Sequence, residues 1–364
     1  MRARTKITQP LPAELSPNWP ITSAGHIIHP MKTVQQFPTN NGRIIYAIPV
    51  RSFPGLVTNC YVISDGNQVI LVDTGSGMDT ANEDLLAGFT AVSEQFTETI
   101  RLQDIDTILL THGHIDHFGG LPFVRQYTDA PIGIHILDRR VVSNHEERVV
   151  FAARRLENFL EEAGVPAPNR DGLMSIYLFG KTYYRSMATQ FSLDEAQPTV
   201  GDIQVFHTPG HCPGQVCLQV DDLLLTADHI LSRTTPHQAP ESITTHMGLS
   251  HYLDALTKME DLPGISLALG GHEEPMADIN GRIHQIKQSH QNRLEKVLAI
   301  CQQPHSIAEV SLELFGPVES YHILLALEEA GAHVEYLYQR GELVAATLDE
   351  IAATSHPVVR YQRA

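Results

Sequence analysis

Residues 111–120, THGHIDHFGG, hold three histidines and one aspartate within six positions, from His112 to His117. They follow the short apolar run DTILL, which is typical of a buried strand. His112 and His114 are two apart, so in extended chain their side chains point the same way, and Asp116 and His117 then fall on the turn before a helix. One zinc ion takes about four ligands. This cluster therefore predicts a metal site and could supply ligands to two adjacent ions. Two ions would need further ligands from other parts of the chain.

Four further candidate ligands follow apolar runs that are typical of strands. The segments are LVDTGSG, FHTPGHCPG, LLLTADH and LALGGHEEP, and their candidate ligands are Asp73, His211, Asp228 and His272. Each stands where a strand gives way to a loop rich in small residues. Other histidines, including His237 and His290, have no such setting and are expected to play no part in the site.

Taken in order, these residues resemble the motifs of the metallo-β-lactamase superfamily over roughly residues 43–285. The resemblance implies an αββα sandwich with a two-metal site at one edge. It implies that Asp228 bridges two divalent ions, with zinc expected first and iron or manganese as alternatives. Asp73 would orient a ligand by hydrogen bonding. The implied ligands are His112, His114 and His211 for the first ion, and Asp116, His117 and His272 for the second.

The alternation of strand and helix predicts an α/β fold. Paired strands are expected over 43–73, with a turn at Asp65–Gly66, and a helix over 79–98. A helical insertion over about 140–192 is expected to open at a Ser143–Glu146 capping box. A long amphipathic helix is predicted over 283–301, followed by a Ser306–Glu309 capping box, two short helices and a β-rich tail. We expect a catalytic domain over 1–285 and a connecting helix with a winged-helix-like domain over 286–364.

The segment THGHIDHFGG is similar to the core of glyoxalase II, whereas the tail resembles the superfamily branch that carries a C-terminal winged helix. That branch includes acyl-thioesterases that act on carrier-bound polyketides, and an RNA endonuclease. Residues 301–364 hold three basic and nine acidic residues, a formal charge of −6. Nucleic-acid binding needs lysine and arginine. The tail is therefore predicted to be a packing or dimerisation element, and a homodimer is possible.

The resemblance implies a hydrolase in which hydroxide held between two metals cleaves a carboxylic thioester, ester or lactone, either small or carrier-bound. Asp116, Asp228 and Asp73 would be the catalytic carboxylates. Aromatic residues in the insertion are expected either to pack it onto the sandwich or to line an acyl pocket as a lid. Three alternatives remain open: a phosphodiesterase or ribonuclease, a mono-iron persulfide dioxygenase, and a non-catalytic metal sensor. The candidate substrate-binding residues are Tyr177, Phe179, Tyr183, Tyr184 and Arg185.

Composition limits the classes of partner and the cellular compartment that we expect for this protein. The formal charge of −17 disfavours nucleic acid as a partner. The four cysteines form no CxxC pair, and no run approaches the ~20 apolar residues of a membrane span. The first residues lack the apolar run of a signal peptide. We therefore expect a cytoplasmic protein without a membrane partner.

Overall fold

The structure is a computed structural model that describes residues 33–96, 98–194 and 199–364. Residues 1–32, where no signal peptide is expected, lie outside the described residues. So do residue 97, within the predicted 79–98 helix, and residues 195–198. In the part of the chain that the structure describes, no helix is both long and apolar enough to cross a membrane.

The first sheet of the described residues runs in the order β1 to β7. Strands β1 to β4 pair antiparallel, and β4 to β7 pair parallel. The predicted turn at Asp65–Gly66 joins β3 to β4, and Gly66 has a φ of 84°. The bounds are β1 Gln35–Pro38, β2 Ile44–Phe53, β3 Leu56–Ser64, β4 Val69–Val72, β5 Thr107–Leu110, β6 Ile132–Ile134 and β7 Phe191–Ser192.

The second sheet has the order β12-β11-β10-β9-β8. Its strands pair antiparallel except β11 with β12, which are parallel. The bounds are β8 Thr199–Val200, β9 Ile203–His207, β10 Val216–Val220, β11 Leu223–Ala227 and β12 Leu267–Gly270.

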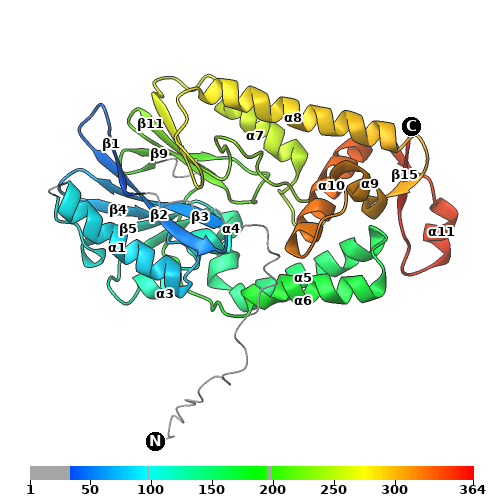
Figure 1. The fold of residues 1–364 in the computed structure, drawn as a ribbon, viewed down its shortest axis with the longest axis horizontal. Helices are drawn as coiled ribbons and strands as arrows, with labels where there is room; N and C mark the ends of the chain where they lie inside the picture. The colour runs from blue at the N-terminus through cyan, green and yellow to red at the C-terminus, as the bar shows by residue number, and fades with distance from the viewer. Residues whose placement is uncertain (1–32, 97, 195–198) are drawn as a thin grey trace, which may run out of the picture. The chain divides into compact units, whose positions relative to one another are not determined.

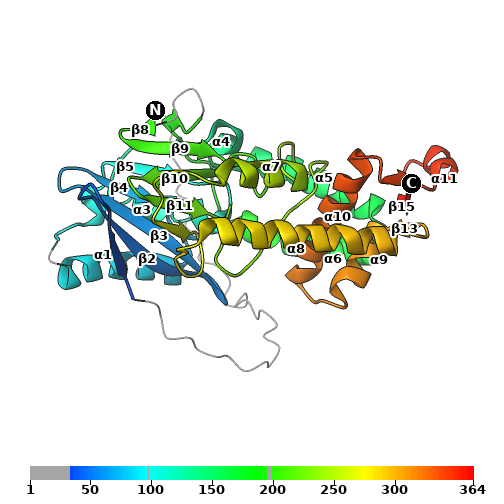
Figure 2. The ribbon, with the colours of Figure 1, turned by 90° about the horizontal axis from the view of Figure 1, so that it is seen from above.

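The two sheets pack face to face, and helices cover their outer faces (Figures 1 and 2). Side chains alternate along each strand. In β2, Ile45 therefore enters the core between the sheets, whereas Tyr46 packs under α1 (Asp79–Gln95). In β11, Leu225 faces the same inner core, and Leu224 faces α7 (Leu249–Met259) and α8 (Ile279–Ile300). This arrangement confirms the predicted αββα sandwich.

Shorter helices connect the strands of the first sheet. They are the 3₁₀ turn Leu102–Asp104, α2 Ile115–Phe118 and α3 Leu121–Val124. The insertion between β6 and β7 contains α4 Ile136–Ser143, α5 His145–Glu162 and α6 Ala167–Lys181. The prediction of a capping box was wrong, because Ser143 ends α4 and its hydroxyl binds Asn144, while Glu146 binds Ser186.

The C-terminal region contains α9 (Ile307–Phe315), α10 (Tyr321–Gln339) and α11 (Leu348–Ala353). Its sheet has the order β13-β15-β14, formed by His305–Ser306, Arg360–Arg363 and Leu343–Ala345. The Ser306–Glu309 capping box is confirmed at the start of α9. The prediction of two short helices was wrong for α10, which has 19 residues. The assignment as a winged helix stays a prediction.

One apolar core joins this region to the insertion and to the second sheet. Phe159 of α5 and Leu173 of α6 belong to the same buried cluster as Leu327 and Val334 of α10. The helix α8 passes through the expected domain boundary at residue 285 and contributes Ile286 and Val297 to that cluster.

Candidate metal centre

The ends of several elements bring the expected ligands to one edge of the sandwich. One loop and one short helix supply the HxHxDH segment, and the other ligands follow strands. Asp73 follows β4, His112 and His114 lie between β5 and α2, Asp116 and His117 lie on α2, His211 lies between β9 and β10, Asp228 follows β11, and His272 follows β12.

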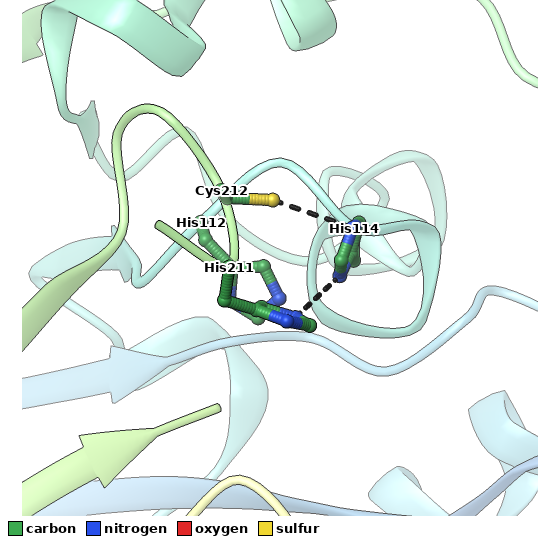
Figure 3. Close-up of side chains that lie close together, drawn as sticks. All are labelled: His112, His114, His211 and Cys212. Atoms are coloured by element: carbon green, nitrogen blue, oxygen red, sulfur yellow. Dashed lines mark hydrogen bonds between the residues drawn. The ribbon is translucent and has the colours of Figure 1, made fainter. Parts of the chain in front are cut away.

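His112, His114 and His211 converge on one side of this edge (Figure 3). His114 Nδ1 is 2.9 Å from His211 Nε2, and His114 Nε2 is 3.3 Å from the Sγ of Cys212. The His112 ring centroid lies 4.8 Å from that of His114 and 5.3 Å from that of His211. Three imidazoles and one thiol thus form a compact group of possible nitrogen and sulfur ligands.

Asp228 lies at the middle of the cluster. Its Oδ2 is 3.2 Å from the Nε2 of His272 and 3.5 Å from that of His117. The same oxygen is 3.7 Å from the Nε2 of His211 and 4.0 Å from that of His112. One carboxylate oxygen therefore faces four imidazole nitrogens. Two belong to His112 and His211, and two belong to His117 and His272.

Asp116 completes the other side. Its Oδ2 is 3.4 Å from His272 Nε2, 3.5 Å from His117 Nε2 and 3.4 Å from the hydroxyl of Thr58. These side chains are almost fully buried. Asp116, His117 and His272 form a second group of possible ligands beside the first.

The outward ring nitrogens of the histidines are held by the protein. His112 Nδ1 is 3.0 Å from the Thr111 hydroxyl, and His117 Nδ1 is 2.8 Å from an oxygen of Asp73. His211 Nδ1 contacts the His237 carbonyl at 2.9 Å, and His272 Nδ1 contacts the Val57 carbonyl at 2.7 Å. A histidine that donates from Nδ1 presents the lone pair of Nε2, and this contact also fixes the direction of its ring.

Asp73 serves two of these histidines. Its carboxylate accepts from the Thr111 backbone N–H at 2.8 Å and from the Thr111 hydroxyl at 2.7 Å, besides contacting His117. It therefore orients His117 directly and His112 through Thr111. Its φ of 61° is in the left-handed region, which aspartate tolerates better than most residues.

The buried polar atoms fit a cation. His112 Nε2, His117 Nε2 and Asp228 Oδ1 are buried and have no hydrogen-bond partner. Buried polar groups are normally paired, so exceptions need a reason. Imidazole nitrogens and carboxylate oxygens are ligands of divalent metals such as zinc. The residues present therefore fit the metal ions that the sequence motif implies.

The ionisation of the side chains agrees with this fit. Burial and the neighbouring imidazoles hold the pKa of His112 and His114 well below its usual value, so these rings are neutral, as metal binding requires. Burial opposes protonation of His272 too, but Asp228 and Asp116 raise its pKa to about 10. The two carboxylates thus favour positive charge at the histidine rings. A bound metal cation would supply that charge and displace the ring protons.

Comparison with known proteins decides the family. The family model described as the metallo-beta-lactamase superfamily matches residues 53–299, which include every expected ligand. The chain belongs to the metallo-beta-lactamase superfamily.

Individual relatives are similar to most of the chain. The "Probable metallo-hydrolase YqjP" of Bacillus subtilis is 24% identical over 75% of this chain and 85% of its own. The "Atrochrysone carboxyl ACP thioesterase" of Aspergillus fumigatus is 24% identical over 67% of this chain, which covers 60% of that relative. A metallo-beta-lactamase family protein from Thermus thermophilus has a crystal structure with a TM-score of 0.70 and 27% identity, over 88% of this chain and 98% of that one.

Three residues at this superfamily site escaped the sequence analysis. Cys212 follows His211 directly, so its position could have been a signal. Thr58 contacts Asp116 from β3, where nothing in the strand pattern distinguishes it. Asp138 of α4 is buried and accepts from the backbone N–H groups of Gly113 at 2.8 Å and Gly214 at 2.9 Å, so it joins the two ligand loops.

The aromatic residues of the insertion have different positions. The Tyr184 hydroxyl donates to the Ser76 carbonyl at 2.5 Å, and burial and the charge of Asp116 raise its pKa. Tyr177 is half-buried, with the Lys181 ammonium 4.6 Å from its ring centroid. By contrast, Phe179 and Tyr183 are exposed and contact each other. Arg185 is also exposed and donates to the carbonyls of Thr182 and Tyr184.

Proposed function

We propose that this protein is a hydrolase that uses two divalent metal ions to cleave an acyl thioester, ester or lactone. His112, His114 and His211 would hold one ion, and Asp116, His117 and His272 the other, with Asp228 between them. Zinc is the first choice, and iron or manganese are alternatives, because His/Asp sites accept several ions. The observation that carries this proposal is Asp228 Oδ2, which lies within 4.0 Å of four histidine Nε2 atoms.

When bound, two adjacent cations lower the pKa of a water molecule and polarise the substrate's carbonyl oxygen. The histidines fix the geometry of the site, and Asp73 keeps two of them in the required orientation. Asp116, beside the Thr58 hydroxyl, can accept the proton that water loses on attack. Asp228 can assist departure of the leaving group. For a thioester, the carbon–sulfur bond breaks, a carbon–oxygen bond from water forms, and the products are a carboxylic acid and a thiol.

The choice of an acyl substrate has three supports. The Aspergillus fumigatus relative is by its name a thioesterase for a carrier-bound acyl group. Tyr184 of the insertion lies near enough for the charge of Asp116 to act on it, and Tyr177 contacts Lys181 in the same insertion, so the insertion offers aromatic surface that suits an acyl chain. The charge of −17 disfavours a nucleic-acid substrate. We therefore propose that Tyr177 and Tyr184 contact the substrate, and that exposed Phe179, Tyr183 and Arg185 contact only a bulky or carrier-bound part of it.

Hydrolysis of a substrate panel tests this function. Zinc-reconstituted protein and a chelated control would receive acyl thioesters, lactones, aryl esters and a phosphodiester. We expect turnover of a thioester, ester or lactone that chelation abolishes, and a loss of at least about 100-fold in Asp228→Asn. Asp254→Asn, an exposed site on α7, should keep full activity.

Two outcomes would contradict the proposal in different ways. Full activity of Asp228→Asn would refute the role of this carboxylate in the metal site. Turnover confined to the phosphodiester would preserve the metal site but replace the acyl substrate with a phosphorus centre.

A further inference from the structure

We propose that α10 of the C-terminal region positions the metal ligand His211, with Glu328 and Glu329 as positioning residues that act through His237. This inference rests on the metal site proposed above. It gives the C-terminal region a role in the chemistry of the site without contact with substrate.

The starting point is the outward contact of His211. The rings of His112, His117 and His272 are oriented by Thr111, Asp73 and Val57, which all belong to the first sheet or its loops. His211 instead takes its contact from the backbone carbonyl of His237, at 2.9 Å. His237 lies in the long connection between β11 and α7. The direction of the His211 ring therefore depends on the position of that connection.

Helix α10 holds this connection through both ring nitrogens of His237. The Nε2 atom of His237 is 3.0 Å from an oxygen of Glu328, and its Nδ1 atom is 3.4 Å from an oxygen of Glu329. The same Glu329 oxygen accepts from the Gln238 backbone N–H at 2.8 Å. Both ring nitrogens of His237 thus contact carboxylates of one helix.

A third glutamate extends the same attachment. Glu335 accepts from the backbone N–H groups of Glu241 at 2.6 Å and of Ser242 at 3.1 Å. Glu328 and Glu335 are seven residues apart, which is close to two helical turns, so both lie on one face of α10. Glu328, Glu329 and Glu335, three of the nine acidic residues of the tail, therefore face this chain's own loop.

Contacts with α8 also hold Glu329 in place. It is buried, and Arg293 of α8 donates to its second oxygen at 2.9 Å. One turn later, His333 Nδ1 contacts the Glu329 carbonyl at 2.7 Å, and His333 Nε2 lies 3.1 Å from His290 Nδ1. His290, Glu329 and His333 are close enough to suggest another metal site. Arg293 already neutralises the carboxylate and the rings bond to each other, so the group serves as a rigid support.

The decisive measurement is zinc affinity of the full-length chain, from competition with a chromophoric chelator. We expect Glu328→Ala and Glu329→Gln to lower the zinc affinity of one of the two sites about tenfold. This is the low end of the losses caused by replacing residues that orient a metal ligand. Glu328→Gln keeps an acceptor for His237 and should restore most of the affinity. Glu342→Gln, an exposed change in the same region, should keep the affinity unchanged.

A matched variant separates positioning from stability. Val334→Ala removes two methyl groups from the fully buried face of α10 without touching the glutamates. It should lower the melting temperature of the metal-free protein yet leave both zinc affinities unchanged. If Val334→Ala weakens zinc binding as much as Glu329→Gln, or if Glu328→Ala and Glu329→Gln bind zinc like the wild type, the positioning role is refuted. A wild-type chain that binds no zinc would refute the metal site itself and this inference with it.

Discussion

At the scale of single residues, the site depends on side chains that fix the direction of a ring. Asp73 accepts two hydrogen bonds from Thr111 and contacts His117 Nδ1, so every oxygen of its carboxylate is used. The motif could predict Asp73 because it stands at the end of an apolar strand. Thr111 could not be predicted in the same way, because a threonine at a strand end is common and its hydroxyl has no spacing rule.

An Asp73→Asn substitution tests this role. Asparagine also tolerates positive φ, so the backbone should persist. Its amide NH₂ replaces one acceptor, however, and leaves either the Thr111 backbone N–H or both the Thr111 hydroxyl and His117 without an acceptor. We expect a loss of zinc affinity of about 10- to 100-fold, measured by chelator competition. Asp171→Asn, an exposed change in α6, serves as the control. Wild-type zinc affinity in Asp73→Asn would show that the ring directions are fixed by other contacts.

At the scale of elements, the two ligand loops are joined by the first turn of α4. Asp138 is buried there and binds Gly113 of one loop and Gly214 of the other. Burial raises the pKa of Asp138 to about 6, because the two backbone N–H groups only partly offset the lost hydration. No periodic pattern links positions 113, 138 and 214. Their contact arises from the tertiary fold, so the sequence could not predict it.

A pair of glycine substitutions tests how tightly these elements fit. A Cβ atom at Gly214 would lie 2.8 Å from the backbone nitrogen and side chain of Asp138, so α4 or the loop would have to move. We expect Gly214→Ala to lower the free energy of unfolding by about 1–3 kcal/mol and to weaken zinc binding at the site. Urea unfolding and chelator competition measure the two effects.

The matched control lies in α6. A Cβ atom at Gly172 meets nothing within 4 Å, and alanine favours a helix interior by about 0.5–1 kcal/mol. Gly172→Ala should therefore stabilise the protein and leave zinc affinity unchanged. Equal effects of the two substitutions would contradict a specific packing role for Gly214.

At the scale of the whole molecule, the sequence predicts the layers better than their connections. Apolar strands that end in ligand types predict both the sandwich and the edge that carries the site. The role of α10 is different. Glu328, Glu329 and Glu335 contribute to a tail charge of −6, and acidic residues on a helix usually face solvent. Here they bind His237 and backbone N–H groups, so charge counting alone could not reveal the contact.

The buried group of His290, Glu329 and His333 should make the free energy of unfolding sensitive to acid. His290 is buried on α8, and its Nε2 has no hydrogen-bond partner. Burial, His333 and Arg293 lower its pKa to about 3, although Glu329 acts in the opposite direction. An unfolded histidine takes up a proton near pH 6.5. Its contribution to stability is therefore complete above pH 6.5 and declines as the pH falls toward 3.

His290→Asn should remove this acid sensitivity. The asparagine amide can still donate to His333, but it does not titrate. From pH 7.5 to pH 5, the wild type should lose about 2 kcal/mol more unfolding free energy than the variant, since one pKa unit corresponds to about 1.4 kcal/mol. Urea unfolding of chelated protein at both pH values measures this difference without a contribution from bound metal. His284→Asn, on the exposed face of the same helix, should lose as much stability as the wild type. Equal losses in His290→Asn and the wild type would contradict this prediction. They would mean that His290 can gain a proton while the protein stays folded.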